Sequence, residues 1–185
     1  MTSSETFFNS LASYSSEDEK LPPVEDWHPD YCGEIDILIK ANGEWFHQGS
    51  LIKRANLFRL FSKLLVKEGE NYFLVTPIEK MAIKVEWMPF VIQDFDCLSI
   101  DGKTTYVFYD NCGNNIKLQD LEQLSFSKFN QLELPIIRVR KNLYASFTRS
   151  SYYRLIEQAE VKEKDNKQQV CIESSGIKFY LGECE

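Results

Sequence analysis

Apolar and polar positions follow their clearest pattern between residues 33 and 86, which predicts strand, turn, strand, helix and two more strands. Ile35, Ile37 and Ile39 occupy every second position, a period typical of a half-buried strand. Asn42-Gly43 follows, and this dipeptide favours a two-residue hairpin turn because both residues tolerate positive φ. The sequence therefore predicts a β-hairpin over residues 35–48.

A two-residue turn decides which side chains share a face of that hairpin, because directly paired residues point the same way. We expect Phe46 to join Ile37 and Ile39 in the core. Trp45 and His47 are then expected on the outer face, beside Asp36, Leu38 and Lys40. Such a face could bind a ligand. The alternative is that a second element covers it and leaves His47 partly buried with its polar atoms satisfied.

Helical spacing takes over at residues 51–67, where apolar side chains recur every three or four positions and lysines and arginines lie between them. Ser50 is the expected N-cap and Gly69 the expected residue just beyond the helix. Strands are predicted at 72–75 and 81–87. Pro77 stiffens the turn between them, so residues 76–80 are well placed for recognition.

The same order of elements returns in the second half, after a less regular meander with a hairpin turn at Asp101-Gly102. A second helix is expected over 149–160, and residues 57–61 align with residues 152–156 without gaps. We therefore predict an α+β fold of two pseudo-repeated ββαββ units of mainly antiparallel sheet, bridged by a small β-meander. The expected divisions are 1–21 (a tail or short docked helix), 22–88, 89–134 (the bridge) and 135–185.

The composition of the chain excludes several classes of function but does not assign one. The net charge is −7, which opposes binding to nucleic acid or to anionic membranes. The five cysteines are odd in number and form no CxxC pair, and only two histidines occur, so we expect no disulfide framework and no metal site. No signal peptide or membrane-spanning run is visible, so a cytoplasmic protein is expected. Phosphate-binding loops and nucleophile motifs are absent, and no cofactor is predicted.

Two arginines give the strongest hint of a binding site. Arg54 and Arg149 each stand near the start of a predicted helix, where the helix dipole is already positive. Arg54 should therefore have an acceptor, Glu79 or Asp36. A structural ion pair is one interpretation, and a site where arginine and helix amides converge on a carboxylate or phosphate is the other. A hydrolase that uses Asp36 and His47 is a separate alternative.

Several short motifs together resemble a bacterial family, domain of unknown function 1285. They are Trp27-His-Pro-Asp-Tyr-Cys-Gly33, Asn42-Gly-Glu-Trp-Phe-His-Gln-Gly49, Leu74-Val-Thr-Pro-Ile-Glu-Lys80, Ile137-Arg-Val-Arg-Lys-Asn-Leu143 and Arg149-x-x-Tyr-Tyr153. The resemblance covers nearly everything after residue 22. It implies a repeated α+β fold in cytoplasmic bacterial proteins, with no established activity or cofactor and a link to signalling.

The candidate site residues come from the physical reasoning and from the family pattern taken together. These are Trp45, His47, Arg54, Thr76, Glu79 and Lys80 in the first half, and Arg140 and Arg149 in the second. Our leading hypothesis is a non-enzymatic binding or regulatory module that recognises a small anionic ligand or a protein partner through these residues. The third hypothesis is a structural protein–protein interaction module, which could form a homodimer.

Overall fold

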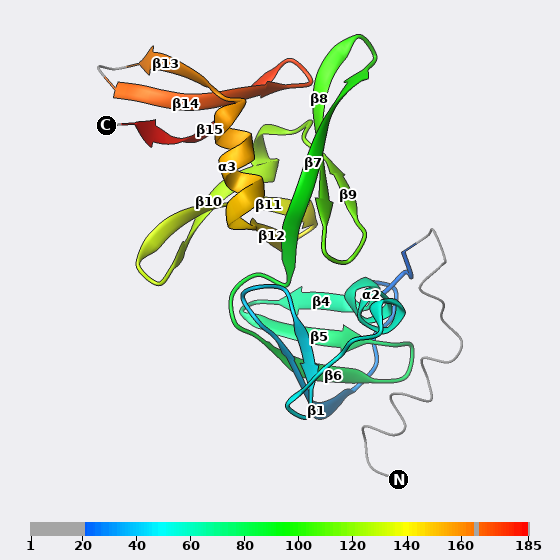
Figure 1. Cartoon of the computed structure of the whole chain (residues 1–185). Helices are drawn as coiled ribbons and strands as arrows, with labels where there is room; N and C mark the ends of the chain where they lie inside the picture. Colours follow the sequence, from blue (N-terminus) through cyan, green and yellow to red (C-terminus); the bar gives the residue numbers. More distant parts are fainter. Residues whose placement is uncertain (1–20, 165–166, 185) are drawn as a thin grey trace. The chain divides into compact units, whose positions relative to one another are not determined.

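The protein is described here by a computed structural model, which covers residues 21–164 and 167–184 (Figure 1). Its chain forms two compact units, Met1–Pro89 (unit 1) and Phe90–Glu185 (unit 2). Each unit combines antiparallel strands with one main α-helix, so the predicted α+β class is confirmed. The short helix expected within residues 1–20 lies outside the described residues.

Unit 1 is built on one six-stranded sheet in the order β3-β2-β1-β6-β5-β4. Neighbouring strands are antiparallel except β1 and β6, which run parallel across the middle of the sheet. The elements are β1 (Tyr31–Ile39), β2 (Trp45–His47), β3 (Ser50–Leu51), α2 (Ala55–Lys63), β4 (Leu65–Glu68), β5 (Asn71–Val75) and β6 (Lys80–Val85).

Helix α2 packs on the inner face of this sheet. Its Phe61 is fully buried, and the ring lies 6.1 Å from the ring of Trp45 in β2, measured between centroids. The helix is shorter than predicted, because Leu64 donates its backbone N–H to the carbonyl of Phe61, and Leu65 then begins β4 by pairing with Leu74 of β5. Gly69 (φ 58°) serves the turn between β4 and β5 instead of ending the helix.

Unit 2 contains a second six-stranded sheet, in the order β10-β11-β12-β7-β8-β9, and a separate three-stranded sheet, β13-β14-β15. Its elements are β7 (Phe90–Ile100), β8 (Lys103–Asp110), β9 (Asn115–Lys117), the 3-10 helix η2 (Leu121–Gln123), β10 (Leu124–Phe129), β11 (Leu132–Arg140), β12 (Leu143–Phe147), α3 (Arg149–Glu157), β13 (Glu160–Lys164), β14 (Lys167–Ser174) and β15 (Ile177–Cys184).

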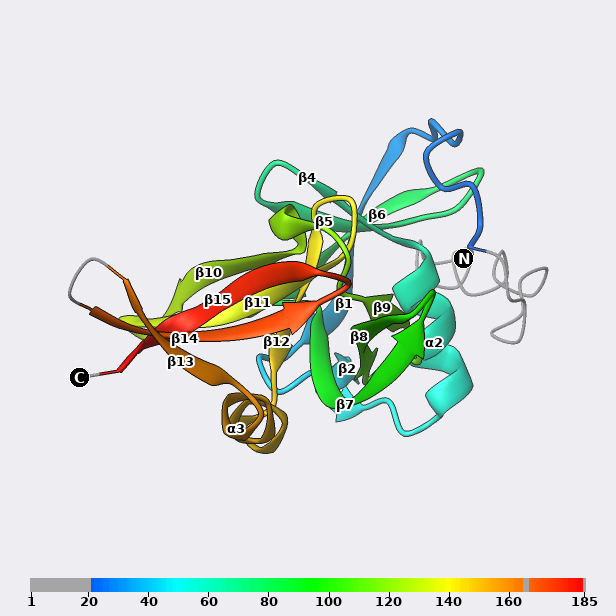
Figure 2. The same cartoon turned by 90° about the horizontal axis from the view of Figure 1, so that it is seen from above.

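The three-stranded sheet is tied to the larger sheet of unit 2 by side chains from both. In the view of Figure 2, β15 passes over β10 and β11, and the rings of Phe126 in β10 and Tyr180 in β15 meet at 5.7 Å between centroids. Ser174 receives the backbone N–H of Tyr106 at 2.9 Å and donates its hydroxyl to the carbonyl of Leu118. The meander predicted as a bridge is thus built into unit 2, since β7 pairs with β12.

The predicted repeat is visible in the order of the elements. A hairpin, a helix and three antiparallel strands occur as β1–β2, α2, β4–β6 in unit 1 and as β11–β12, α3, β13–β15 in unit 2. A further correspondence joins the two large sheets, because each pairs its first strand in parallel with its sixth, β1 with β6 and β7 with β12. The units differ in where the last three strands go: β4–β6 complete the large sheet, whereas β13–β15 form their own.

Candidate functional site

The outer face of the unit 1 sheet, opposite α2, carries a groove of about 740 Å³. Strands alternate their side chains between faces, so the buried Ile35, Met81 and Leu74 point inward while their neighbours point outward. The outward side chains lining the groove come from three adjacent strands. They are Tyr31, Glu34 and Asp36 of β1, Lys80, Ala82 and Lys84 of β6, and Asn71 and Phe73 of β5.

Ala82 lies at the centre of this face and explains why the groove exists. In the sheet register Ala82 stands between Glu34 on one side and Phe73 on the other. Cross-strand neighbours are close enough that their side chains normally fill the space between them. A single methyl group among longer side chains leaves a hollow there.

The backbone of β1 contributes a second irregularity. The parallel ladder pairs Glu34 with Ala82 and next pairs Leu38 with Lys84, so three residues of β1 oppose one residue, Ile83, of β6. A bulge of this kind bends the strand away from its partner and interrupts the ladder of peptide groups. Bulges are enriched beside functional sites, and this one lies beside the groove.

Aromatic rings and a lysine form one end of the groove. Tyr31 and Phe73 make an edge-to-face contact with centroids 6.3 Å apart, and Tyr31 is 57% exposed. Lys80 holds its ammonium group 4.9 Å from the centre of the Phe73 ring and pairs with Glu68 at 2.8 Å. An apolar group entering this end would meet two ring surfaces that are already ordered.

The turn before Lys80 contains two of the predicted site residues, Thr76 and Glu79, and both are buried. Thr76 donates its backbone N–H to the Glu79 carbonyl at 2.9 Å, and its hydroxyl accepts the Glu79 N–H at 3.1 Å. These residues therefore shape the turn that presents Lys80, and neither lines the groove. Burial raises the pKa of the Glu79 carboxyl, and among the residues that the structure describes none hydrogen-bonds to its Oε2.

Replacing Glu79 with glutamine is expected to stabilise the protein at pH 7. A carboxyl whose pKa is higher in the folded state favours folding at low pH, and that contribution is lost as the pH rises through the folded pKa. Burying a neutral amide costs less desolvation free energy than burying a carboxylate. The advantage should vanish below pH 4.5, the ordinary pKa, in urea unfolding curves measured across this range. Glu70→Gln, an exposed control, should show no such pH-dependent gain.

The predicted positions of Trp45 and His47 are wrong, because the hairpin register differs by one residue. Ile39 pairs with Trp45, and Ile37 pairs with His47, so both side chains lie on the inner face. Trp45 is only 1% exposed and belongs to the core. Phe46, predicted in the core, instead lies on the outer face, where the ammonium of Lys40 sits 4.6 Å from its ring centre.

This register also separates the residues of the hydrolase alternative. Asp36 points outward from β1, whereas His47 points inward beside Ile37. The two side chains thus stand on opposite faces of one sheet, and the arrangement does not supply a histidine oriented by Asp36.

Arg54 occupies the N-cap position of α2, and its side chain is exposed. Among the described residues, no ion pair joins it to Glu79 or to Asp36, and the expected partnership is therefore wrong. Glu79 is buried in its turn, and Asp36 faces the groove.

The two arginines predicted in unit 2 have structural contacts. Arg149, the first residue of α3, donates a hydrogen bond to the hydroxyl of Tyr153 one turn later at 3.2 Å and lies over its ring. Arg140 lies over the ring of Phe90 and near Asp110. Burial lowers the pKa of the Arg140 guanidinium, and the charge of Asp110 opposes that change. Neither arginine lines the groove, which lies wholly within unit 1.

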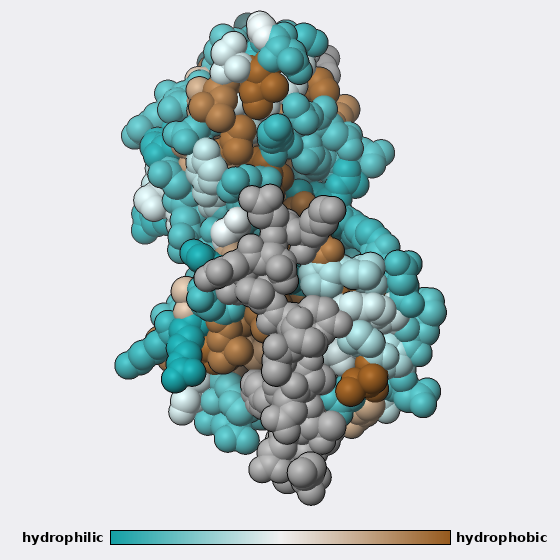
Figure 3. Space-filling model, turned by 90° about the vertical axis from the view of Figure 1, so that its right-hand side faces the viewer, coloured by the Kyte–Doolittle hydropathy of each residue, from teal (hydrophilic) through white to brown (hydrophobic). Residues whose placement is uncertain are grey.

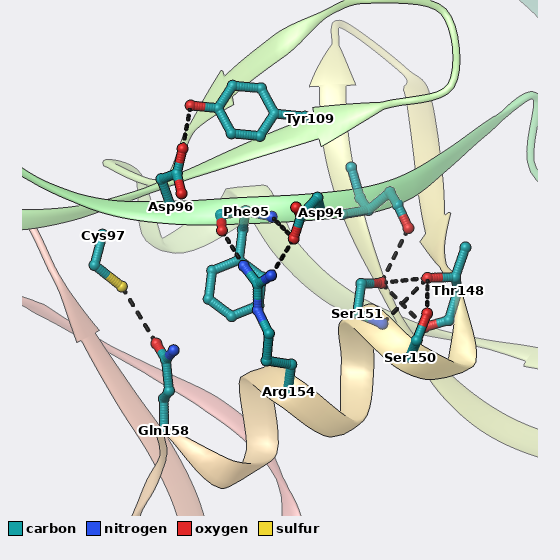
Figure 4. A network of polar contacts seen from close by, with 11 residues as sticks. Asp94, Phe95, Asp96, Cys97, Tyr109, Thr148, Ser150, Ser151, Arg154 and Gln158 are labelled. Atoms are coloured by element: carbon teal, nitrogen blue, oxygen red, sulfur yellow. Dashed lines mark hydrogen bonds and ion pairs between the residues drawn. The ribbon is translucent and has the colours of Figure 1, made fainter.

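A polar network in unit 2 fastens α3 to β7 (Figure 4). Arg154 pairs with the carboxylate of Asp94, donates to the carbonyl of Phe95 and stacks over the Phe95 ring. Ser151 donates to the carbonyl of Ile92 at 3.0 Å, so the helix is held at its start as well as in its middle. These contacts account for how α3 is fixed in place, and we assign the network a structural role.

The groove residues that the sequence interpretation missed are Tyr31, Glu34, Phe73, Ala82 and Lys84. Each lies in a predicted strand or beside one. The alternation of side chains along a strand is enough to predict which of them share a face when they belong to the same strand. Their assembly depends on the parallel pairing of β1 with β6, two strands more than 40 residues apart along the chain.

Two family models match the chain and divide it where the fold does. Residues 22–88 match the N-terminal domain of DUF1285, a domain of unknown function, and residues 89–181 match the C-terminal domain of the same family. The chain belongs to the DUF1285 family. The predicted resemblance is therefore confirmed, and it carries no assigned activity.

Solved structures of DUF1285 proteins support the same fold. The crystal structure of a DUF1285 family protein from Silicibacter pomeroyi DSS-3 is 30% identical, covers 95% of this chain and 93% of its own, and gives a TM-score of 0.79. A DUF1285 family protein from Shewanella baltica OS155 is 24% identical, covers 65% of this chain and 90% of its own, and gives a TM-score of 0.55, which shows the fold alone. No curated protein matches the chain.

Two further observations concern the described part of the chain. None of its helices is both long and apolar enough to cross a bilayer. Within the same residues, no three histidine, cysteine, aspartate or glutamate side chains come together as ligands for a metal ion.

Proposed function

We propose that this DUF1285 protein is a non-catalytic binding module, and that the groove on unit 1 recognises a small ligand with an anionic group. The observation that carries the proposal is the hollow over Ala82, bordered by two ammonium groups and two aromatic rings. A volume of about 740 Å³ falls in the range of small-molecule sites, which combine apolar walls with a few polar groups.

Lys84 and Lys80 give this groove its preference for an anion. Lys84 is exposed, and among the described side chains it makes no ion pair, so it is available to a ligand carboxylate or phosphate. Lys80 is already paired with Glu68, and this carboxylate would weaken the electrostatic attraction between Lys80 and an anionic ligand. We therefore assign Lys84 the larger share of anion recognition and Lys80 a supporting one.

The groove favours binding over catalysis. Asp36 lines it, and among the described lining residues no histidine, serine, cysteine or threonine is present to act as a base or nucleophile. A regulatory role, in which ligand binding is passed on to another component of a bacterial signalling system, fits a module of this kind and remains part of the proposal.

The alternative of a structural interaction module requires a sizeable apolar surface. On the side of the protein shown in Figure 3, the apolar areas that are not hidden by grey atoms are interrupted by hydrophilic residues. That surface gives a docking role less support than the groove gives to small-ligand binding.

Filling the groove tests the proposal. Ala82→Leu places a larger side chain in the hollow without disturbing the core, because Ala82 points outward. A thermal-shift screen of organic acids, phosphates and amino acids should find ligands that raise the melting temperature of the natural protein. Ala82→Leu should lose this response. Ala55→Leu, the same change at an exposed helix position, should keep it.

Two results would count against the groove. A ligand that raises the melting temperature of Ala82→Leu as much as that of the natural protein binds elsewhere. A screen in which no anionic compound stabilises the natural protein removes the proposed class of ligand.

A further inference from the structure

We infer that the ligand of the unit 1 groove is a zwitterion of the amino-acid type with a large apolar side chain. This inference rests on the proposed binding function and adds the chemical class. Its basis is the separation of charge across the groove: exposed carboxylates project from β1, and ammonium groups project from the adjacent β6.

The carboxylates of Glu34 and Asp36 have no role in a groove that binds only an anion. Both are exposed, and among the described residues neither makes an ion pair, although Lys84 stands on the neighbouring strand. A purely anionic ligand would be repelled by them, since like charges at short range disfavour binding. A ligand that carries an ammonium group next to its carboxylate could satisfy both strands at once.

The order of the side chains along β6 determines how such a ligand would be oriented. Lys80 and Lys84 are four residues apart, roughly 13 Å along a strand, with Ala82 midway between them. The Lys80 end holds the rings of Tyr31 and Phe73, and its charge is already matched by Glu68. The apolar side chain therefore belongs at that end. The carboxylate belongs at Lys84, and the ammonium belongs in the middle beside Asp36 and Glu34.

Three matched compounds separate the contributions of the two charges. Phenylalanine carries both, N-acetylphenylalanine lacks the ammonium, and phenylalaninamide lacks the carboxylate. Titrations followed by the backbone NMR signals of unit 1 should show phenylalanine binding roughly two-fold to five-fold more tightly than either derivative, as expected for exposed ionic contacts. The largest shifts should fall at Ala82, Phe73 and Lys84.

Substitutions in the protein should reproduce the losses made in the ligand. In Asp36→Asn, the affinity difference between phenylalanine and N-acetylphenylalanine should shrink, and in Asp36→Asn combined with Glu34→Gln it should vanish, because the carboxylates that select the ammonium are then gone. In Lys84→Gln, phenylalanine and phenylalaninamide should bind with nearly equal affinity, because only the supporting contribution of Lys80 to carboxylate recognition is left. All three substituted side chains are exposed, so none of these changes should prevent folding.

Failure of the zwitterion can be told apart from failure of the groove. If N-acetylphenylalanine binds the natural protein as tightly as phenylalanine, and Ala82→Leu abolishes its binding, the groove is a site and the zwitterion is wrong. The same conclusion follows if none of the three compounds binds while another anion depends on Ala82. If no compound of any class depends on Ala82, both inferences are overturned.

Discussion

Replacing Trp45 with alanine is expected to lower the free energy of unfolding by about 3–5 kcal/mol, the range for truncating a large core aromatic. The Trp45 side chain is 1% exposed, and its ring packs against Phe61 of α2. Alanine would remove this contact and leave a cavity between the helix and β2. Unfolding in urea, followed by circular dichroism, would measure the loss.

The neighbouring residue provides a matched control. Phe46 lies on the outer face of the same strand and is only partly buried, so Phe46→Ala should cost about 1 kcal/mol. Equal losses at the two positions would contradict the register of this hairpin. A larger loss at Phe46 would restore the register expected from a two-residue turn.

The hairpin shows where local sequence signals stop being sufficient. Asn42-Gly43 does form a turn, and Gly43 has φ 84°, but the loop closes one step wider than the dipeptide predicts. Lys40 donates its N–H to the Glu44 carbonyl and accepts the N–H of Gly43. Glu86, more than 40 residues away, takes the N–H of Ala41 at 2.9 Å. A shift of one residue moves every side chain to the other face, and this distant contact has no signature near the turn.

The helix predicted over residues 51–67 fails at its ends for a similar reason. Apolar spacing continues through Leu64 and Leu65, but Leu65 is needed as the strand partner of Leu74. Tertiary pairing overrides local helix preference when a strand edge is available. The turns at Asp101-Gly102 and at residues 76–79 were correctly predicted, because their geometry depends on the residues inside them.

Sequence patterns could not predict the groove, because its residues are brought together by the topology of the sheet. Lys80 was selected as a residue on a rigid turn, and it does line the groove. Its neighbours Tyr31 and Glu34 come from a strand that pairs with β6 in parallel, which hairpin signals do not predict. Arg54, by contrast, was chosen for its helix position and lies exposed without the acceptors proposed for it.

Replacing Asp110 with alanine is expected to destabilise unit 2 by about 3–5 kcal/mol, because each buried group that loses its hydrogen-bond partner costs about 1–3 kcal/mol. Its carboxylate accepts the backbone N–H groups of Cys112 and Asn114 at 2.9 and 2.8 Å, and the Asn114 side-chain amide at 2.7 Å. The substitution would open this loop and leave the partly buried Arg140 without its neighbouring negative charge.

The pH dependence of the free energy of unfolding provides a second test of Asp110→Ala. Burial raises the pKa of the Asp110 carboxyl, while hydrogen bonds from Asn114 and Cys112 and the charge of Arg140 oppose the rise. Because the folded pKa is the higher one, the contribution of this titration to stability is present at low pH and is lost as the pH rises through it. Natural protein should show that decline in urea midpoints measured from pH 4 to 8, and Asp110→Ala should show a smaller one, because the titration of Glu79 remains.

Asp94→Ala is the control for Asp110→Ala, because Asp94 is an aspartate of the same unit that pairs with Arg154 but is exposed. Losing that pair should cost less than about 1 kcal/mol, since water screens both charges and solvates whichever one remains. Asp110 is buried and accepts the backbone N–H groups of its own loop, whereas Asp94 is exposed. Only at Asp110 would the groups left without a partner stay away from water. Comparable losses at the two positions would mean that the hydrogen bonds of the 110–114 loop contribute little, and that Arg140 finds solvent when Asp110 is removed.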